Sequence, residues 1–201
     1  MLNQFSRTQL LLGKEAMDRL KGARVAVFGI GGVGGYVCEA LVRSGVGAID
    51  LIDDDKVCLT NLNRQIIATR KTIGKYKTDV MEERIHDINP DVSVVTHRCF
   101  FLPENADEFP FEEYDYIVDA VDTVTAKIAL VMKAQEKNVP IISSMVWCIW
   151  TEHRQPHMPE SENFPEMTLN VHPVRELCCR QCWRKQRRQI RQHLSKSATV
   201  W

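Results

Sequence analysis

A glycine-rich stretch directly after an apolar run is the feature that most constrains how this chain can fold. Residues 25–28 are Val-Ala-Val-Phe, and the next six residues place Gly29, Gly31, Gly32 and Gly34 in close succession. A turn without side chains, between a buried strand and a helix, lets the backbone approach a phosphate at the helix N-terminus. The pattern predicts a nucleotide site, but many nucleotide-binding folds share it, so it does not by itself identify the nucleotide.

The residues after the second apolar run favour ATP over a dinucleotide. This run ends in acids and is followed by amides and cations: Asp53, Asp54, Asp55, Asn61, Arg64, Gln65 and Lys77. An acid in the position of Asp53 accepts hydrogen bonds from ribose hydroxyls, which ATP and a dinucleotide both have. Arg64 and Lys77 suit a chain of phosphates that carries several negative charges. We therefore expect ATP as the bound nucleotide, with Asp53 rather than Asp54 on its ribose.

Apolar runs of strand length alternate with helical patterns along most of the chain. Strands are expected at 24–29, 48–53, 92–96, 115–120 and 139–143, and helices at 8–20, 33–44, 77–88 and 124–136. This alternation predicts an α/β fold, a Rossmann-like, doubly wound and mainly parallel sheet. Residues 56–72 lack periodicity and are expected to form the floor of the site, beyond the carboxyl ends of the strands. Residues 97–114 are expected to be a loop with a short helical turn.

Composition limits the classes of function. The chain has 201 residues, with 26 Lys and Arg against 26 Asp and Glu, which disfavours a sequence-blind nucleic-acid binder. No apolar stretch is long enough to cross a membrane, and no targeting or lipidation signal is seen, so we expect a cytoplasmic protein without a membrane partner. Seven cysteines, several of them in expected core elements, indicate reduced thiols and no disulfide framework.

Composition also changes abruptly near residue 145. All ten glycines lie before residue 75, and all four tryptophans lie after residue 145. We therefore divide the chain into an ATP-binding domain, 1–145, and an atypical basic, Cys- and Trp-rich tail, 146–201, which we expect to be poorly packed. Cys179 and Cys182 form one Cys-x-x-Cys pair, whereas a closed zinc site needs four ligands, so chance cysteines are the favoured interpretation and metal binding stays open.

Several motifs together resemble a known family. They are the glycine stretch 29–35 and the segments 51–53, 61–65, 74–77, 88–90 and 119–122, preceded by Arg7. Over residues 7–145 the chain is similar to the ubiquitin-activating-like ATP-dependent adenylyltransferases, the ThiF/MoeB/HesA family, which includes sulfur-carrier activators. Residues 44–47, 61–65, 114–122 and Lys127 look most like its bacterial tRNA threonylcarbamoyladenosine dehydratase branch. After residue 145 the chain departs from the family pattern.

The resemblance implies roles for individual residues. Arg64 and Lys77 would contact the phosphates, and Asp122 would bind Mg²⁺ or face the pyrophosphate side. Arg7 would reach the phosphates of the neighbouring subunit in a homodimer. Asn61, Gln65 and Asp55 would complete the nucleotide site. Each role has a plainer alternative: Arg64, Lys77 and Arg7 as surface cations, Asp53 as a solvated acid, and Asp122 as the cap of helix 124–136.

The resemblance also implies a reaction. A substrate carboxylate attacks the α-phosphorus of ATP, pyrophosphate leaves, and an acyl-adenylate results without a protein nucleophile. In the tRNA branch the carboxylate belongs to a threonylcarbamoyl group on a tRNA adenosine, and ring closure expels AMP with net loss of water. Two alternatives remain open: adenylation of the C-terminal glycine of a ubiquitin-like sulfur-carrier protein, and a relative that binds ATP without turnover.

Overall fold

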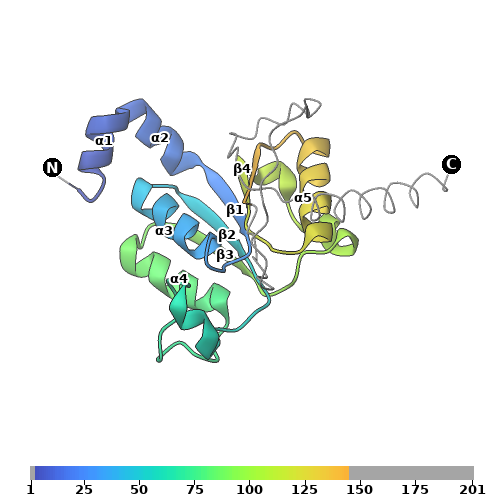
Figure 1. The fold of residues 1–201 in the computed structure, drawn as a ribbon. Coiled ribbons are helices and arrows are strands. Elements are labelled where there is room, and N and C mark those ends of the chain that lie inside the picture. The colour runs from blue at the N-terminus through green and yellow to red at the C-terminus, as the bar shows by residue number, and fades with distance from the viewer. Residues whose placement is uncertain (1–2, 145–201) are drawn as a thin grey trace, which may run out of the picture. The chain divides into compact units, whose positions relative to one another are not determined.

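The computed structural model describes residues 3–144, and its centre is a five-stranded parallel sheet with the order β3-β2-β1-β4-β5 (Figure 1). The strands are β1 (Arg24–Phe28), β2 (Ala48–Ile52), β3 (Ser93–His97), β4 (Tyr116–Asp119) and β5 (Ile141–Ser143). The strand order runs outward from β1 in both directions, so the sheet has its switch point between β1 and β4. The predicted doubly wound α/β fold is therefore confirmed, and ligands of such sheets bind at the carboxyl ends of the strands beside this point.

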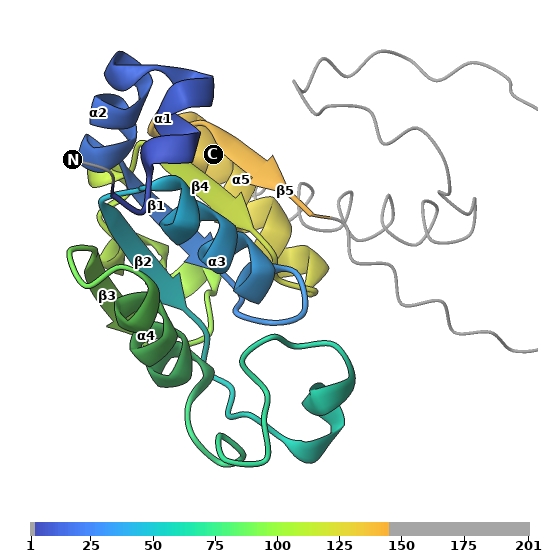
Figure 2. The same cartoon turned by 90° about the vertical axis from the view of Figure 1, so that its left-hand side faces the viewer.

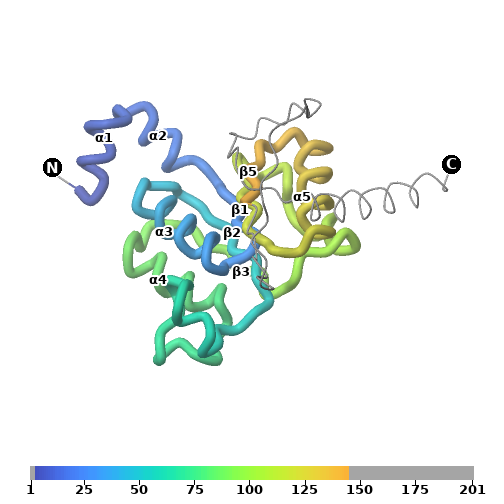
Figure 3. Tube along the Cα trace, in the orientation of Figure 1, coloured from blue at the N-terminus to red at the C-terminus, as the bar shows by residue number. Residues whose placement is uncertain are grey.

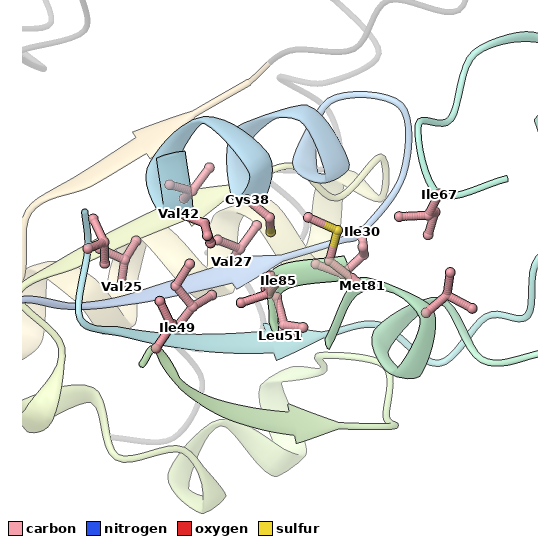
Figure 4. Packing of buried hydrophobic residues seen from close by; sticks show 14 of the residues in the cluster. Val25, Val27, Ile30, Cys38, Val42, Ile49, Leu51, Ile67, Met81 and Ile85 are labelled. Carbon is pink, nitrogen blue, oxygen red and sulfur yellow. The ribbon is translucent and has the colours of Figure 1, made fainter. Parts of the chain in front are cut away.

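Helices cover both faces of the sheet. Helices α3 (Gly34–Ser44) and α4 (Lys77–Ile88) lie on one face, and α5 (Val124–Glu136) lies on the other (Figure 1). Alternate residues of each strand point to opposite faces, so Val27 and Leu51 join one core cluster while Phe28 and Ile52 join the second. Figure 4 shows the first cluster, in which Cys38 of α3 packs with the strand residues.

The segment between β3 and β4 contributes four aromatic side chains to the second core cluster: Phe101, Phe109, Phe111 and Tyr114. Its two short 3-10 helices, η2 (Pro103–Glu108) and η3 (Phe111–Glu113), replace the single short turn expected there. The ring centroids of Phe101, Phe109 and Phe111 lie 5.1, 5.6 and 6.2 Å from that of Phe28. Burial of these rings explains why the segment is ordered although it lacks helical periodicity.

The leading segment differs from the prediction of a single helix over 8–20. It forms two helices, α1 (Ser6–Leu12) and α2 (Lys14–Gly22), which Figure 3 shows meeting at an angle. The break is at Gly13, whose φ of 83° and ψ of 164° belong to a region that residues with a side chain rarely adopt. The apolar spacing continues across this break, so periodicity alone did not reveal it. Leu10 and Leu11 of α1 are 88% and 84% exposed.

A buried carboxylate links β1, β2 and β3 on the aromatic face. Asp50, in the middle of β2, is 0% exposed and accepts hydrogen bonds from Arg24 Nε at 2.8 Å, His97 Nε2 at 3.1 Å and the Tyr114 hydroxyl at 3.1 Å. Burial by itself would raise the pKa of Asp50, but the hydrogen bonds from His97 and Arg24 outweigh it and hold the pKa below its ordinary value. The charge is therefore kept inside the protein by dedicated donors.

Within residues 3–144, no helix is both long and apolar enough to cross a membrane. The expectations for 146–201, including a metal at Cys179 and Cys182, concern residues outside the described part of the chain.

Candidate functional site

The glycine turn joins β1 to α3 at the carboxyl edge of the sheet, where the sequence placed it. Gly29 has a φ of 88°, and a Cβ atom there would lie 2.7 Å from the carbonyl oxygen of Ala120. A Cβ atom on Gly34 would lie 1.8 Å from the carbonyl oxygen of Gly29. The fold itself therefore requires glycine at positions 29 and 34, whatever binds beside them.

Gly31 and Gly32 are different, because the protein leaves room beside them. A Cβ atom on Gly31 would meet only the Gln65 Nε2 atom, at 4.0 Å, and one on Gly32 would meet the Arg64 side chain at 3.6 Å. These are ordinary contacts, so packing does not demand glycine at either position. The open backbone lies just before the N-terminus of α3, whose unpaired N–H groups and dipole favour a phosphate. The turn thus has the shape and polarity that a phosphate chain needs.

Asp53 directly follows β2 and faces this turn. Its carboxylate accepts the backbone N–H of Ile30 at 2.6 Å and that of Asp55 at 2.9 Å. Burial raises the pKa of Asp53, opposed by the positive charge of Lys77 and these two backbone donors. A carboxylate has about four acceptor positions, so two remain for ribose hydroxyls. The side chain is 8% exposed, which rules out the alternative of a solvated acid.

Lys77 opens helix α4 and is buried, so it is not the surface cation that the plainer alternative proposed. Its Nζ atom lies 2.6 Å from Asp55 Oδ2 and 3.6 Å from Asp53 Oδ1. Asp53, Asp54 and Asp55 each place an oxygen within 4.8 Å of the others, but the lysine already contacts two of these carboxylates. Lys75 is instead exposed and pairs with Glu83 at 3.4 Å. The structure therefore separates the two lysines as expected.

The amides of the segment after β2 have unequal roles. Asn61, in the 3-10 helix η1 (Leu59–Asn63), accepts the Cys58 N–H through Oδ1 at 3.0 Å and so closes the turn. Gln65 is 7% exposed. Among the buried side-chain nitrogen and oxygen atoms of residues 3–144, its Oε1 is the one that lacks a hydrogen-bond partner. A buried acceptor without a donor is costly. The other amide atom, Nε2, is the one that lies beside Gly31, so Gln65 presents a hydrogen-bond donor to the turn.

Arg64 is exposed and lies across from Gly32. Its Nη1 atom donates to the Thr60 carbonyl at 3.2 Å and to Asn63 Oδ1 at 3.1 Å, and it makes no ion pair with any described residue. The guanidinium therefore has no acidic partner among these residues and keeps several free N–H groups, which suits two-pronged contact with a phosphate.

Asp122 lies in the loop between β4 and α5, which touches the glycine turn through Ala120. The N-cap position of α5 is Thr123, and no side chain caps the helix. The alternative that Asp122 caps α5 is therefore wrong. Its exposed carboxylate contacts only the Thr123 hydroxyl, at 3.4 Å, among the described residues, and is open to bind a cation.

A buried ion pair beneath this loop had no assigned role in the sequence analysis. Lys127 of α5 donates from Nζ to both carboxylate oxygens of Asp119 at 3.0 Å and to the Ser144 carbonyl at 2.7 Å. Asp119 also accepts the Val121 N–H at 3.2 Å and the Ser143 hydroxyl. The pair joins the loop of Asp122 to the end of β5. An acid that ends a strand, eight residues before a lysine in the next helix, was the available signal.

Arg7 is the predicted site residue that the fold does not bring to this edge. It is exposed on α1, and its neighbour Phe5 packs with Met17 against Gly45, the residue that ends α3. Because α3 begins at the glycine turn and ends at the opposite edge of the sheet, Arg7 lies at the amino edge. The remaining predicted residues meet at the carboxyl edge: Gly29, Gly31, Gly32, Gly34, Asp53, Asp55, Asn61, Arg64, Gln65, Lys77 and Asp122.

Comparisons with known proteins agree with this architecture. The ThiF family model matches residues 5–192. The tRNA threonylcarbamoyladenosine dehydratase of Bacillus subtilis is 47% identical over 145 residues, which are 72% of this chain and 57% of that protein. The crystal structure of the Escherichia coli tRNA N6-threonylcarbamoyladenosine dehydratase in complex with ATP has a TM-score of 0.68 and 42% identity, covering 70% of this chain and 58% of that one.

A sulfur-carrier activator is also similar, at a lower level of identity. The sulfur carrier protein adenylyltransferase of Thermus thermophilus is 37% identical over 123 residues, which are 60% of this chain and 45% of that protein. The chain spans about half the length of the curated relatives that it matches.

Proposed function

Because this chain belongs to the ThiF family, we propose that it binds ATP at the glycine turn and uses it to activate a carboxylate by adenylylation. The observation that carries this proposal is the open backbone at Gly31 and Gly32, bordered by the Arg64 side chain, which has no acidic partner within residues 3–144, and by the Nε2 atom of Gln65. The ATP complex of the similar E. coli dehydratase supports the choice of nucleotide.

Each residue of the site has a role in this proposal. Asp53 accepts the ribose hydroxyls, and Arg64 and Lys77 stabilise the phosphates, with Asp55 holding the lysine ammonium in place. Asp122 would hold Mg²⁺, which would supply positive charge to the phosphates. Arg64 and Lys77 hold their positive charges beside the phosphates before the reaction, so they stabilise the developing negative charge without having to reorganise.

The proposed reaction transfers an adenylyl group. A carboxylate oxygen of the acceptor attacks the α-phosphorus of ATP, the bond from that phosphorus to the β-phosphate bridging oxygen breaks, and pyrophosphate leaves. The products are an acyl-adenylate and pyrophosphate, and no proton or electron is exchanged with the protein. The chain's own contribution is to position the triphosphate and neutralise the charge that pyrophosphate carries away.

We assign the acceptor carboxylate to threonylcarbamoyladenosine in tRNA. The identity of 47% to the B. subtilis dehydratase supports this over the sulfur-carrier alternative, whose T. thermophilus representative is 37% identical. Closure of the ring then releases AMP, with the net loss of one water from the modified base. Such a substrate would place the reaction in the cytoplasm.

The deciding experiment is ATP–pyrophosphate exchange with three additions: modified tRNA, a sulfur-carrier protein ending in Gly-Gly, and no acceptor. We expect exchange that depends on the modified tRNA and on Mg²⁺. Exchange with the carrier protein but not with the modified tRNA would show that the chain activates a sulfur carrier instead. ATP binding without exchange in any sample would show a nucleotide-binding relative without turnover.

We further propose a symmetric homodimer in which Arg7 serves the partner's site. Arg7 lies at the amino edge of the sheet, so it does not contribute to the nucleotide site of its own chain. The exposed Leu10 and Leu11, on the same helix, offer an apolar surface for contact with a second copy. Mixing Arg7→Ala chains with Asp53→Ala chains should restore part of the activity, since a hybrid has one site with both residues. Hybrids that form but remain inactive would confine Arg7 to a surface role.

A further inference from the structure

After the three acids Asp53, Asp54 and Asp55 that follow β2, the chain carries only positive charge up to the first turn of α4. Residues 56–78 include six Lys or Arg and no Asp or Glu, in a chain whose totals of basic and acidic residues are equal. The six cations are Lys56, Arg64, Arg70, Lys71, Lys75 and Lys77. Figure 2 shows this segment extending past the carboxyl end of β2, beside the glycine turn. A concentration of one sign of charge next to the site requires an explanation.

The segment is held in a fixed shape despite its irregular backbone. At its base Lys56 and Tyr76 form an antiparallel bridge, and the Val57 and Lys75 backbones share a hydrogen bond of 2.9 Å. Val57 and Ile67 are each 2% exposed and belong to the core cluster, in which Figure 4 shows Ile67 at the end occupied by Ile30. The charges are therefore carried by an anchored element, whose position relative to the glycine turn is set by packing.

A threonine hydroxyl organises the outermost turn. Thr72 Oγ1 donates to the Ile67 carbonyl at 2.8 Å and accepts the Thr69 N–H at 2.8 Å. These bonds close residues 67–72 into a compact turn. Arg70 and Lys71 occupy its exposed corner. Their adjacent positive charges are thus presented to solvent together.

Four of the six cations have contacts that account for them, among them Lys56, whose Nζ atom lies 4.7 Å from the centroid of the Tyr76 ring. Lys77 pairs with Asp55, Lys75 pairs with Glu83, and Arg64 lies beside Gly32, so these three serve the site or its frame. Arg70 and Lys71 make no ion pair with any residue between 3 and 144. Nothing in the nucleotide site accounts for these two charges.

We propose that Arg70 and Lys71 bind the phosphate backbone of the RNA whose carboxylate is activated at the glycine turn. This inference rests on the proposed function, since it names how that acceptor is held. The two cations belong to the segment that lies beside the glycine turn but do not border the turn itself, so a ligand that reaches both places must be large (Figure 2). RNA carries one phosphate on every nucleotide, which suits two exposed cations that lack a fixed acidic partner.

The test compares two variants that each lose two exposed positive charges. One is Arg70→Ala/Lys71→Ala. The control is Arg19→Ala/Lys21→Ala on α2, whose side chains are exposed and make no ion pair within the described residues. Affinity for the modified tRNA is measured with the full chain at several salt concentrations, together with ATP affinity and turnover of the tRNA.

Loss of two phosphate contacts should lower the slope of log affinity against log salt by about 2, roughly one unit for each cation removed. The tRNA dissociation constant near ~0.1 M salt should rise roughly 10- to 100-fold. ATP affinity should stay unchanged, because neither side chain borders the glycine turn. The control should keep the slope of the unaltered chain.

The outcomes separate this inference from the proposed function. If tRNA turnover is intact but the Arg70/Lys71 variant keeps the slope of the control, the RNA surface is refuted and the function stands. If neither the variants nor the unaltered chain turns over tRNA, yet the salt dependence of tRNA affinity falls in the Arg70/Lys71 variant alone, the proposed reaction is refuted and the RNA-binding surface is supported. A variant that loses affinity for an acidic sulfur-carrier protein while its tRNA slope is unchanged would assign the surface to a protein partner and refute the RNA inference.

Discussion

Replacement of Lys127 by methionine tests whether the buried pair beneath the Asp122 loop supports the domain. The Lys127→Met change keeps an unbranched chain of similar length but leaves Asp119, which is 0% exposed, without its cation. Breaking a buried ion pair in this way costs about 3–5 kcal/mol. Two neutral donors, the Val121 N–H and the Ser143 hydroxyl, remain on the carboxylate, so we expect a loss near the lower end of this range, about 3 kcal/mol.

Unfolding in urea and by heat measures this loss. A change of 1 kcal/mol shifts Tm by roughly 2–4 °C in proteins of 150–250 residues, so Tm should fall by roughly 6–12 °C. Lys133→Met is the matched control, because Lys133 is on the same helix but pairs with Asp107, whose side chain is 90% exposed. We expect little change in the control, since exposed pairs are screened by water.

The double variant Asp119→Asn/Lys127→Met distinguishes a buried-charge effect from a packing effect. Removing the carboxylate charge as well should recover roughly 1–2 kcal/mol of the lost stability, because the cost comes from an uncompensated buried charge. Equal Tm values for Lys127→Met and Lys133→Met would refute the reasoning. The reasoning would also be refuted if Asp119→Asn lowered the stability of the Lys127→Met chain by as much as it lowers that of the unaltered chain.

Three further predictions address the site and the core. Gly34→Ala should prevent the turn from forming, because its Cβ would lie 1.8 Å from a backbone oxygen. Gly31→Ala should instead leave the midpoint of urea unfolding unchanged and weaken ATP binding, which calorimetry can measure. Arg64→Ala and Lys77→Ala should each reduce pyrophosphate exchange far more than adenosine binding, since their charges are assigned to phosphates; equal loss of adenosine affinity would contradict that. The folded-state pKa of Asp50 lies below its ordinary value of 3.8, so its stabilising contribution is present above that pH and is lost as pH falls through the lower folded value. Asp50→Asn should therefore flatten the acid side of the stability-against-pH curve, measured by urea unfolding below pH ~5.

Local sequence patterns were sufficient for the fold and for the position of the candidate site within it. Strand and helix periodicity depends on which face of each element is buried, and this is written in neighbouring residues. The glycine turn and Asp53 are likewise placed by strand ends, and the carboxyl ends of parallel strands meet at one edge of the sheet. Periodicity missed the break at Gly13, because apolar spacing continues across it, and it did not resolve the two 3-10 helices η2 and η3.

Only the tertiary structure decided what each of those residues contacts. It separated Gly29 and Gly34, which the fold requires, from Gly31 and Gly32, beside which it leaves space. It buried Lys77, at the start of α4, against the carboxylates of Asp53 and Asp55, which lie at the other end of the connection from β2. Such facts depend on contacts between residues far apart along the chain, whose burial and partners no short pattern encodes. The sequence by itself therefore determined where the candidate site lies, while the packing of distant segments decided which of its groups are committed to the fold and which are left free for a ligand.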